Sequence, residues 1–119
     1  MTQRIKKGSR GRDGANFGIV LVTCSSADEG EKMARGLVVD RLAACVNMVK
    51  NVDSLFWWEG KVDHAQEVLL VIKTQKSRFS ALESYVKAHH SYQVPEMIFL
   101  PIATGHGPYL NWIRDSLRG

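Results

Sequence analysis

The sequence predicts an α+β domain of the ferredoxin-like type, a βαββαβ sandwich followed by a C-terminal helix. Two observations lead to this fold class. Apolar runs of strand length alternate with segments that have the periodicity of amphipathic helices, in the order strand, helix, strand, strand, helix, strand. In addition, 119 residues with a hydrophobic content of 45% suit one domain with a real but small core.

The first strand and helix of the pattern are expected at the start of the apolar sequence. Phe17–Cys24 is short, apolar and rich in β-branched residues, which is typical of a buried strand. A capping box then starts a helix, because the Ser26 side chain can accept a hydrogen bond from the backbone of Glu29. The apolar stripe of this helix consists of Ala34, Leu37, Val38 and Leu42.

The middle of the chain predicts two strands that form a long ribbon. Residues 43–49 indicate the second strand, and residues 55–62 continue extended to a turn or bulge at Gly60. Gln66–Thr74 is the clearest strand of the sequence, and its uninterrupted apolar centre indicates burial on both faces.

The last third of the chain completes the pattern. Ser77 or Ser80 can cap a second helix that ends near His89. Glu96–Ile102 indicates the fourth strand, and Pro108 favours the start of a closing helix. The first of these helices has Phe79, Leu82 and Val86 on one apolar stripe, and the closing helix presents Tyr109, Leu110, Ile113 and Leu117.

The net charge of +4 belongs to the N-terminal residues and not to the folded part. Residues 1–13 hold five basic side chains and one acidic one, whereas the remainder holds 11 of each sign. We therefore expect a disordered basic tail over 1–16 and one domain over 17–119. A basic arm that binds nucleic acid is the alternative, and we expect no nucleic-acid partner.

The apolar segments and the cysteines bear on the cellular compartment. No apolar run approaches the roughly 20 residues that span a bilayer, so we expect no membrane partner. The basic start has no apolar region after it and does not read as a secretory signal, which favours the cytoplasm. Cys24 and Cys45 fit no paired pattern, and free thiols in a reducing compartment are expected.

The long ribbon also predicts an oligomer. Two helices cover one face of a four-stranded sheet, and one closing helix is too short to hide the apolar load on the other face. We therefore expect association through the sheet edge of the ribbon. Trp57 and Trp58 are neighbours on a strand and point to opposite faces, so one is expected in the protomer core and one at a subunit boundary or in a cleft there.

Five segments together resemble the CutA divalent-cation-tolerance family, with order and spacing intact from about Ile19 to Leu117. They are Leu42–Asn47, Trp57–Lys61, Glu67–Thr74, His90–Glu96 and Tyr109–Ile113. The resemblance implies a homotrimer of ferredoxin-like protomers, similar in build to the PII signalling proteins. It also implies a role in the tolerance of copper and other divalent metal ions.

The chain departs from the family pattern at two positions. The family's His-Pro-Tyr motif has Ser91 in place of proline. Some members carry a thiol at the position of Val22, whereas here the thiol is Cys24, two residues further along. On a regular strand that spacing keeps the thiol on the same face.

Three residues are candidate metal ligands, and copper is the candidate metal. His89 and His90 offer imidazole, which suits copper and zinc, and Cys24 offers a thiolate, which suits Cu(I). Neighbouring helical residues do not face the same way, so both rings converge only where the helix has unwound or where another subunit contributes. The alternative is two surface histidines at a helix end and a buried core cysteine.

A ligand-binding cleft at a subunit boundary is the other candidate site. Its residues come from the segments that resemble the family and combine an aromatic wall with a few polar groups. The alternative is a set of intersubunit ion pairs and hydrogen bonds. The candidate cleft residues are Cys45, Trp58, Glu67, Lys73, Tyr92 and Glu96.

Three functions follow from these candidate sites. The first is a trimeric protein that binds copper or other divalent ions and contributes to the metal response. The second is a small-ligand-sensing or scaffold trimer of the PII kind whose metal binding is incidental. The third is a small enzyme with a pocket around Cys45, Lys73 and Tyr92. No catalytic motif supports the third, so we expect a protein that is not an enzyme.

Overall fold

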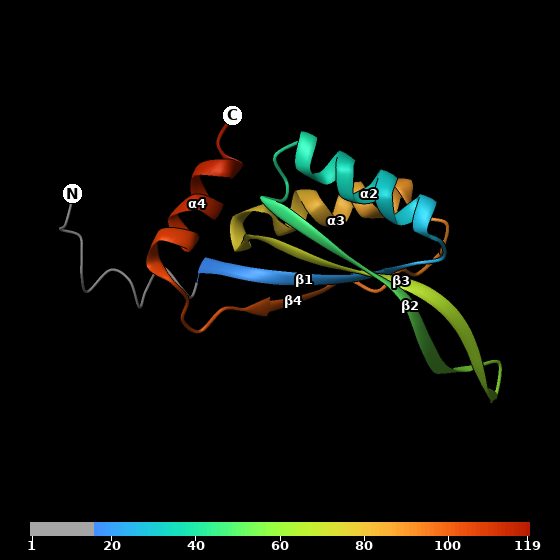
Figure 1. The fold of residues 1–119 in the computed structure, drawn as a ribbon. Coiled ribbons are helices and arrows are strands. Elements are labelled where there is room, and N and C mark those ends of the chain that lie inside the picture. The colour runs from blue at the N-terminus through green and yellow to red at the C-terminus, as the bar shows by residue number, and fades with distance from the viewer. Residues whose placement is uncertain (1–15) are drawn as a thin grey trace.

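The structure, a computed structural model, describes residues 16–119 and shows a four-stranded antiparallel sheet in the order β2-β3-β1-β4 (Figure 1). The sheet carries helices on one face, so the predicted α+β, ferredoxin-like fold is confirmed. The elements are β1 (Phe17–Cys24), α2 (Ala27–Val39), β2 (Cys45–Trp58), β3 (Lys61–Gln75), a 3₁₀ turn (Lys76–Arg78), α3 (Phe79–His89), β4 (Ile98–Pro101) and α4 (Gly107–Leu117). Apart from Asn16, the predicted tail over 1–16 lies outside the described residues. No helix among the described residues is long and apolar enough to span a membrane.

Helix α2 begins as predicted and ends earlier than predicted. Ser26 Oγ accepts a hydrogen bond from the Glu29 backbone N–H at 3.1 Å, which confirms the N-cap. At the other end Arg41 has a φ of 62°, and the Leu42 N–H donates to Leu37 O at 2.9 Å. This is a Schellman ending in which arginine takes the left-handed position usually held by glycine. Leu42 therefore packs against the core from outside the helix.

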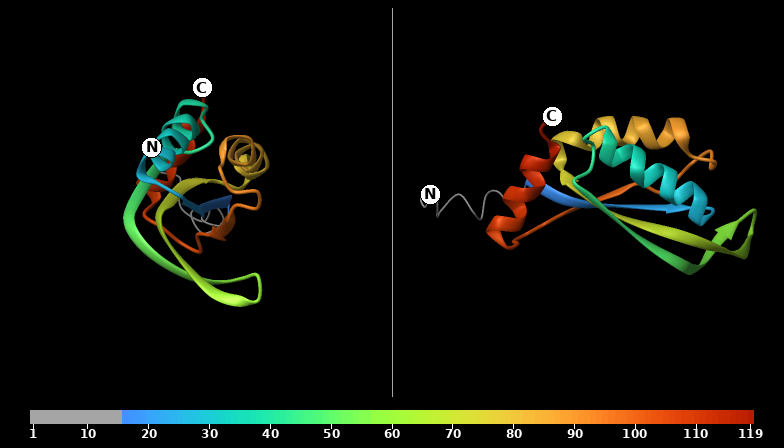
Figure 2. Two further views of the ribbon diagram at one scale, coloured as in Figure 1. Left: turned by 90° about the vertical axis from the view of Figure 1, so that its right-hand side faces the viewer. Right: turned by 45° about the horizontal axis from the view of Figure 1, so that its top comes forward.

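Strands β2 and β3 form one long hairpin, which extends away from the rest of the domain (Figures 1 and 2). Glu59 and Gly60 connect the strands, and their φ values of 49° and 81° are those of a tight turn with two left-handed residues. The turn predicted at Gly60 is confirmed. Between Val49 and Val52 the register shifts, and Asn51 has a φ of 60°, so a bulge divides the ribbon in two.

Helices α2 and α3 cover one face of the sheet and bury the main core (Figure 2). Phe17 instead packs with α4 at one end of the sheet. The buried apolar positions of the main core alternate along β1 and β3. They are Val20, Val22, Cys24, Val68, Leu70 and Ile72.

The second face of the sheet, which we call the open face, remains partly exposed in one protomer. Its residues on β3, Leu69 and Val71, are only half-buried, and Ile98 and Leu100 on β4 are 47% and 45% exposed. The expectation that the strand over Gln66–Thr74 is buried on both faces is therefore wrong for the single protomer, since only the face under the helices is closed.

Three further expectations differ from the structure. Neither Ser77 nor Ser80 caps α3, because the 3₁₀ turn leads into the helix without a side-chain cap. The fourth strand is shorter than predicted and covers Ile98–Pro101 only. Trp57 and Trp58 are 76% and 57% exposed, so neither lies in the core of its own protomer.

Candidate functional site

The end of the sheet where β1 stops gathers three potential metal ligands. Cys24 is the last residue of β1, Glu29 lies in the first turn of α2, and His90 follows the last turn of α3. One ligand atom from each side chain lies within 4.8 Å of the others. The structure thus brings two of the predicted metal residues, Cys24 and His90, together and adds Glu29. The Cys24–Glu29–His90 set is called the cluster below.

The ring of His90 is fixed by hydrogen bonds at both nitrogens. Nδ1 accepts from the Tyr92 backbone N–H at 2.9 Å, so the proton is on Nε2, which donates to Thr23 O at 2.7 Å. The side chain is fully buried, and its Nδ1 lies 3.9 Å from a Glu29 oxygen. His90 therefore joins the end of α3 to the end of β1 as a neutral imidazole.

Glu29 is held by donors from two segments. Its carboxylate accepts from Ser25 N–H at 2.8 Å and from Ser91 N–H at 2.7 Å. Burial acts to raise the pKa of Glu29, but these hydrogen bonds outweigh it and lower the pKa to about 2. Glu29 is accordingly ionised at neutral pH and links the start of α2 to the loop after α3.

Cys24 is a protonated thiol in the absence of a cation. Burial raises the pKa of Cys24 to about 12, with smaller contributions from the negative charges of Glu29 and Glu67. A metal ion that coordinates the sulfur displaces this proton outright. A cation at the cluster also relieves the repulsion between the thiolate and the carboxylates.

The chemistry of the cluster fits copper or zinc. A thiolate, an imidazole and one carboxylate are ligands that these ions accept, and one more position is left for water or for another group. The cost of binding is also visible, because the His90 Nδ1 and the Glu29 oxygens already accept hydrogen bonds from Tyr92 and Ser91. Coordination through His90 Nδ1 therefore requires the Tyr92 N–H to give up its bond, whereas each Glu29 oxygen has a second lone pair and can bind a metal while it accepts the Ser91 N–H.

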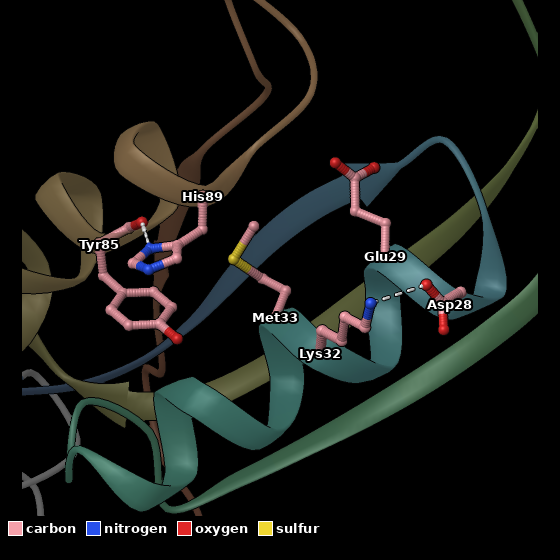
Figure 3. Close-up of a pocket in the computed structure, with 6 residues that line it drawn as sticks. All are labelled: Asp28, Glu29, Lys32, Met33, Tyr85 and His89. Carbon is pink, nitrogen blue, oxygen red and sulfur yellow. Dashed lines mark hydrogen bonds and ion pairs between the residues drawn. The ribbon is translucent and has the colours of Figure 1, made fainter.

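His89 does not join the cluster. Its Nδ1 donates to Tyr85 O at 2.8 Å, and its ring stacks on the Tyr85 ring with centroids 4.0 Å apart. The side chain instead lines a groove of about 340 Å³ between α2 and α3 (Figure 3). The residues that line this groove are Asp28, Glu29, Lys32, Met33, Tyr85 and His89.

The candidate cleft residues lie at separate places in one protomer. Cys45 and Lys73 are paired across β2 and β3 near α4, and the Lys73 amine donates to Asn47. Glu67 lies six positions along β3 from Lys73, which corresponds to roughly 20 Å of strand. Trp58 is at the far tip of the hairpin. A single protomer therefore does not assemble these groups into one cleft.

Two of the cleft residues do meet. The Tyr92 hydroxyl donates to the Glu67 carboxylate at 2.6 Å, and Glu67 is only 9% exposed. Burial and this hydrogen bond raise the pKa of Tyr92. Burial, followed by the charge of Glu67, raises the pKa of Glu96 as well. This end of the sheet thus collects negative charge around Tyr92.

Glu29 was not predicted from the sequence as a member of the site. The capping box explained that residue fully, and a cap needs no second role. The signal that was available is its spacing, because an acid in the first turn of a helix lies beside the last residue of the preceding strand when the connection is as short as Ser25–Ser26. Ser91 and Tyr92 contribute backbone N–H groups, and such groups cannot be recognised from the side chains in a sequence motif.

Comparisons with known proteins place these observations in a family. The sequence profile of the CutA1 divalent ion tolerance protein matches residues 18–116. "Protein CutA 1, chloroplastic" of Oryza sativa is 46% identical over 100 residues, covering 84% of this chain and 56% of the relative. "Divalent-cation tolerance protein CutA" of Thermus thermophilus is 45% identical over 98 residues, covering 82% and 95%.

Solved structures agree with the sequence comparisons. The crystal structure of CutA1 from Oryza sativa superimposes with a TM-score of 0.85 at 43% identity, covering 89% of this chain and 97% of that one. The chain spans only 55% to 62% of the length of the curated relatives from rice, Arabidopsis thaliana and Xenopus laevis.

Proposed function

The chain belongs to the CutA1 divalent ion tolerance family, and on that premise we propose that it is a homotrimer that binds copper or another divalent cation and contributes to the metal-ion response. The observation that carries the proposal is the cluster, where a thiol, a carboxylate and an imidazole lie within 4.8 Å. In the absence of metal, His90 Nδ1 and the Glu29 carboxylate accept hydrogen bonds from the protein, and the Cys24 thiol is protonated. A metal ion therefore competes with those hydrogen bonds and with that proton. We expect moderate affinity and therefore a response to elevated metal.

The trimer is supported by apolar surface that one protomer leaves exposed. Leu55 and Trp57 are each 76% exposed on one side of the hairpin, and Phe56 and Trp58 are 39% and 57% exposed on the other. The hairpin therefore exposes apolar side chains on both of its sides, and it projects next to the half-exposed open face. This arrangement favours a trimer in which the tip of the hairpin is inserted between neighbouring subunits.

A small-ligand-sensing trimer of the PII kind is the second candidate. The observation that favours it is the scatter of the cleft residues, with Cys45 and Lys73 at one end of β3 and Glu67 and Tyr92 at the other. In a trimer, neighbouring subunits would bring together one end of β3 from one chain, the other end from another chain, and a hairpin tip that carries Trp58. The result would be a cleft with an aromatic wall and a few polar groups that point into it. In this function metal binding is incidental.

We further propose that the protein is a binding protein of the cytoplasm and not an enzyme. Both cysteines are free, which suits a reducing compartment. In the cluster the thiol is protonated and His90 has both nitrogens engaged, so no group there is arranged as a nucleophile with a base.

The test of metal binding uses Co²⁺ as a spectroscopic substitute for other divalent ions. Thiolate coordination gives a sulfur-to-cobalt charge-transfer absorption, so the cluster predicts this band in the untagged protein, with saturation at one ion per chain. Competition with Cu⁺ under anaerobic conditions and with Cu²⁺ or Zn²⁺ then ranks the metals. We expect Cu⁺ to depend most on the thiol, since thiolate is the softest of the three ligands.

The two cysteines provide a matched pair of variants. Cys24→Ser is expected to abolish the charge-transfer band, whereas Cys45→Ser is expected to retain it. A band that survives in Cys24→Ser and disappears in Cys45→Ser would move the metal to the β2–β3 ribbon. The absence of any band in the wild-type protein would remove the metal function and leave the PII-like candidate.

A further inference from the structure

We propose that Ser91 is a positioning residue that holds Glu29 among the ligands of the cluster and thereby favours divalent cations over Cu⁺. The inference rests on the proposed metal-binding function and adds a determinant of metal preference at a position where the chain departs from the family pattern. Ser91 lies in the loop after α3, and it acts on the metal through Glu29 rather than as a ligand.

Glu29 belongs to the cluster because of the direction in which its carboxylate points. Asp28, its neighbour in the first turn of α2, is exposed and pairs with Lys32 at 3.2 Å. The Glu29 carboxylate instead points away from Asp28 and Lys32 (Figure 3), and its side chain is only 15% exposed. Its Oε2 lies 3.9 Å from His90 Nδ1 and accepts the Ser91 N–H at 2.7 Å. The Ser91 bond therefore fixes the oxygen that lies beside the imidazole.

Ser25 holds the other oxygen of the carboxylate and does not replace Ser91. The Ser25 N–H and hydroxyl donate to Oε1 of Glu29 at 2.8 Å and 2.9 Å. Within residues 16–119, the backbone N–H of Ser91 is the one hydrogen-bond donor to Oε2. The Ser91 hydroxyl also lies 3.4 Å from the Ser25 hydroxyl, so the two serines form one frame around the carboxylate. Loss of the Ser91 N–H would leave Oε2 free to turn away from His90.

This N–H is available because residue 91 is serine. The family's His-Pro-Tyr motif has proline here, and proline has no backbone N–H to donate. His90 has a φ of −94° and a ψ of 143°, which is the extended conformation that a residue before proline adopts. The backbone of His90 is therefore compatible with either residue at position 91, and the donor to Glu29 is what serine adds.

A fixed carboxylate matters more to a divalent ion than to Cu⁺. Soft ligands such as the Cys24 thiolate satisfy Cu⁺, whereas Zn²⁺ takes four ligands and accepts carboxylate oxygen among them. The charges lead to the same preference. The thiolate and the Glu29 carboxylate together neutralise a divalent ion, but around Cu⁺ they leave a negative charge in a buried site, which is unfavourable.

The experiment compares Ser91→Pro, which removes the N–H, with Ser91→Ala, which retains it. The charge-transfer band gives the Co²⁺ affinity of the full chain, and anaerobic competition gives the Cu⁺ affinity. Ser91→Pro is expected to weaken Co²⁺ binding by about tenfold or more, as for the loss of a group that orients a ligand, while Cu⁺ binding changes by less than about threefold. Ser91→Ala is expected to keep the wild-type preference.

Glu29→Gln tests whether Ser91 acts through Glu29. This variant should itself weaken Co²⁺ more than Cu⁺, and the addition of Ser91→Pro to it should cause no further loss. A second readout needs no metal. In the metal-free protein, Glu29→Gln should speed the exchange of the Ser91 amide hydrogen measured by NMR, because an amide that donates to a charged carboxylate is held more strongly than one that donates to a neutral acceptor.

The proposal is overturned if Ser91→Pro leaves the Co²⁺ affinity unchanged. It is also overturned if Co²⁺ and Cu⁺ are weakened equally, since the proline would then disturb Cys24 or His90. If Ser91→Pro does not fold, Glu29→Gln decides, because an equal loss of both metals or an unchanged amide exchange overturns the role of Ser91. The absence of the band in the wild-type protein overturns the metal function as well, so the two failures are distinguishable.

Discussion

The base and the tip of the β2–β3 ribbon both carry large apolar side chains, but their surroundings are opposite. In the base, Val46 and Met48 on β2 face Ile72 and Leu70 on β3, and helices cover them. In the tip, Leu55 and Trp57 are each 76% exposed on an equally regular ladder. The bulge between Val49 and Val52 marks the boundary between the two regions.

Apolar strand residues therefore do not by themselves identify a protomer core. The base has a partner in its own chain, since β1 extends the sheet and α2 and α3 close its face. The tip has no such partner among the described residues, yet it carries large apolar side chains whose exposure to water is unfavourable. We infer that neighbouring subunits of the proposed trimer cover these side chains.

The largest expected effect is in the base. Leu70 is fully buried and lies between Val22 of β1 and Met48 of β2. Leu70→Ala is expected to lower the free energy of unfolding by about 2–5 kcal/mol, because the core relaxes only partly around a lost side chain. Urea denaturation measures this, and a loss well below that range would show that the base is loosely packed.

The tip is expected to respond through assembly. Trp57→Ala and Trp58→Ala remove side chains that make few contacts in the protomer, so a free tip predicts a change within about 0.5 kcal/mol. A tip inserted between subunits predicts a loss of about 2 kcal/mol or more for an aromatic interface residue. Melting curves over a dilution series distinguish a free tip from an inserted tip. Only a variant with a weakened trimer has a melting temperature that falls more steeply with dilution than that of the wild type.

Leu70→Ala is the control for that dilution series, since it destabilises the protomer without touching the tip. Light scattering of each variant gives the mass directly. If the wild-type protein has a monomer mass at micromolar concentration, or if neither tryptophan variant changes the concentration dependence, the apolar tip does not form an interface.

The fold was predictable from the sequence because periodicity and caps act locally. The Ser26 cap, the turn at Gly60 and the order of strands and helices all follow from neighbouring residues. The early end of α2 was not predictable in this way. Arg41 has no preference for a left-handed φ, and the Schellman bonds to Leu37 and Val38 become favourable only because Leu42 packs on the core.

The candidate site was predictable only in part. Cys24 and His90 were identified by their side-chain chemistry, and their convergence depends on where β1 and α3 end. His89 was grouped with His90 because they are adjacent, yet the helix ends between them and sends the two rings to different neighbours. The cleft residues stay a prediction, because their meeting requires contacts between chains that one sequence does not specify.

A smaller effect is expected at Glu29, and it depends on pH. The pKa of Glu29 is lowered from 4.5 to about 2 in the folded protein, so its stabilisation is full above pH 4.5 and is lost as pH falls toward 2. Glu29→Gln is expected to cost the metal-free protein about 1–3 kcal/mol at neutral pH. The difference from wild type should shrink in acid, as measured by urea unfolding across that range.

Glu31→Gln is the matched control, because Glu31 lies on the same helix and, within residues 16–119, forms an ion pair only with Arg35 at the surface. Its effect should stay within about 1 kcal/mol at every pH. An equal loss for Glu29→Gln in neutral and acidic solution would mean that the bonds to Ser25 and Ser91 do not depend on the negative charge, and that Glu29 acts through packing.

The smallest effect on stability is expected for a substitution of Gly60, in the turn at the tip of the hairpin. A Cβ at this position meets no atom within 4 Å, so in the protomer the cost of Gly60→Ala comes only from a φ of 81° and should be about 1–2 kcal/mol. Gly60→Asn is the matched variant, because asparagine tolerates the left-handed region, and it should recover most of that cost. If the partner subunit instead packs against the turn, both variants lose stability, and the loss grows on dilution. Recovery in Gly60→Asn at every concentration would limit the subunit contact to the tryptophans and exclude the turn.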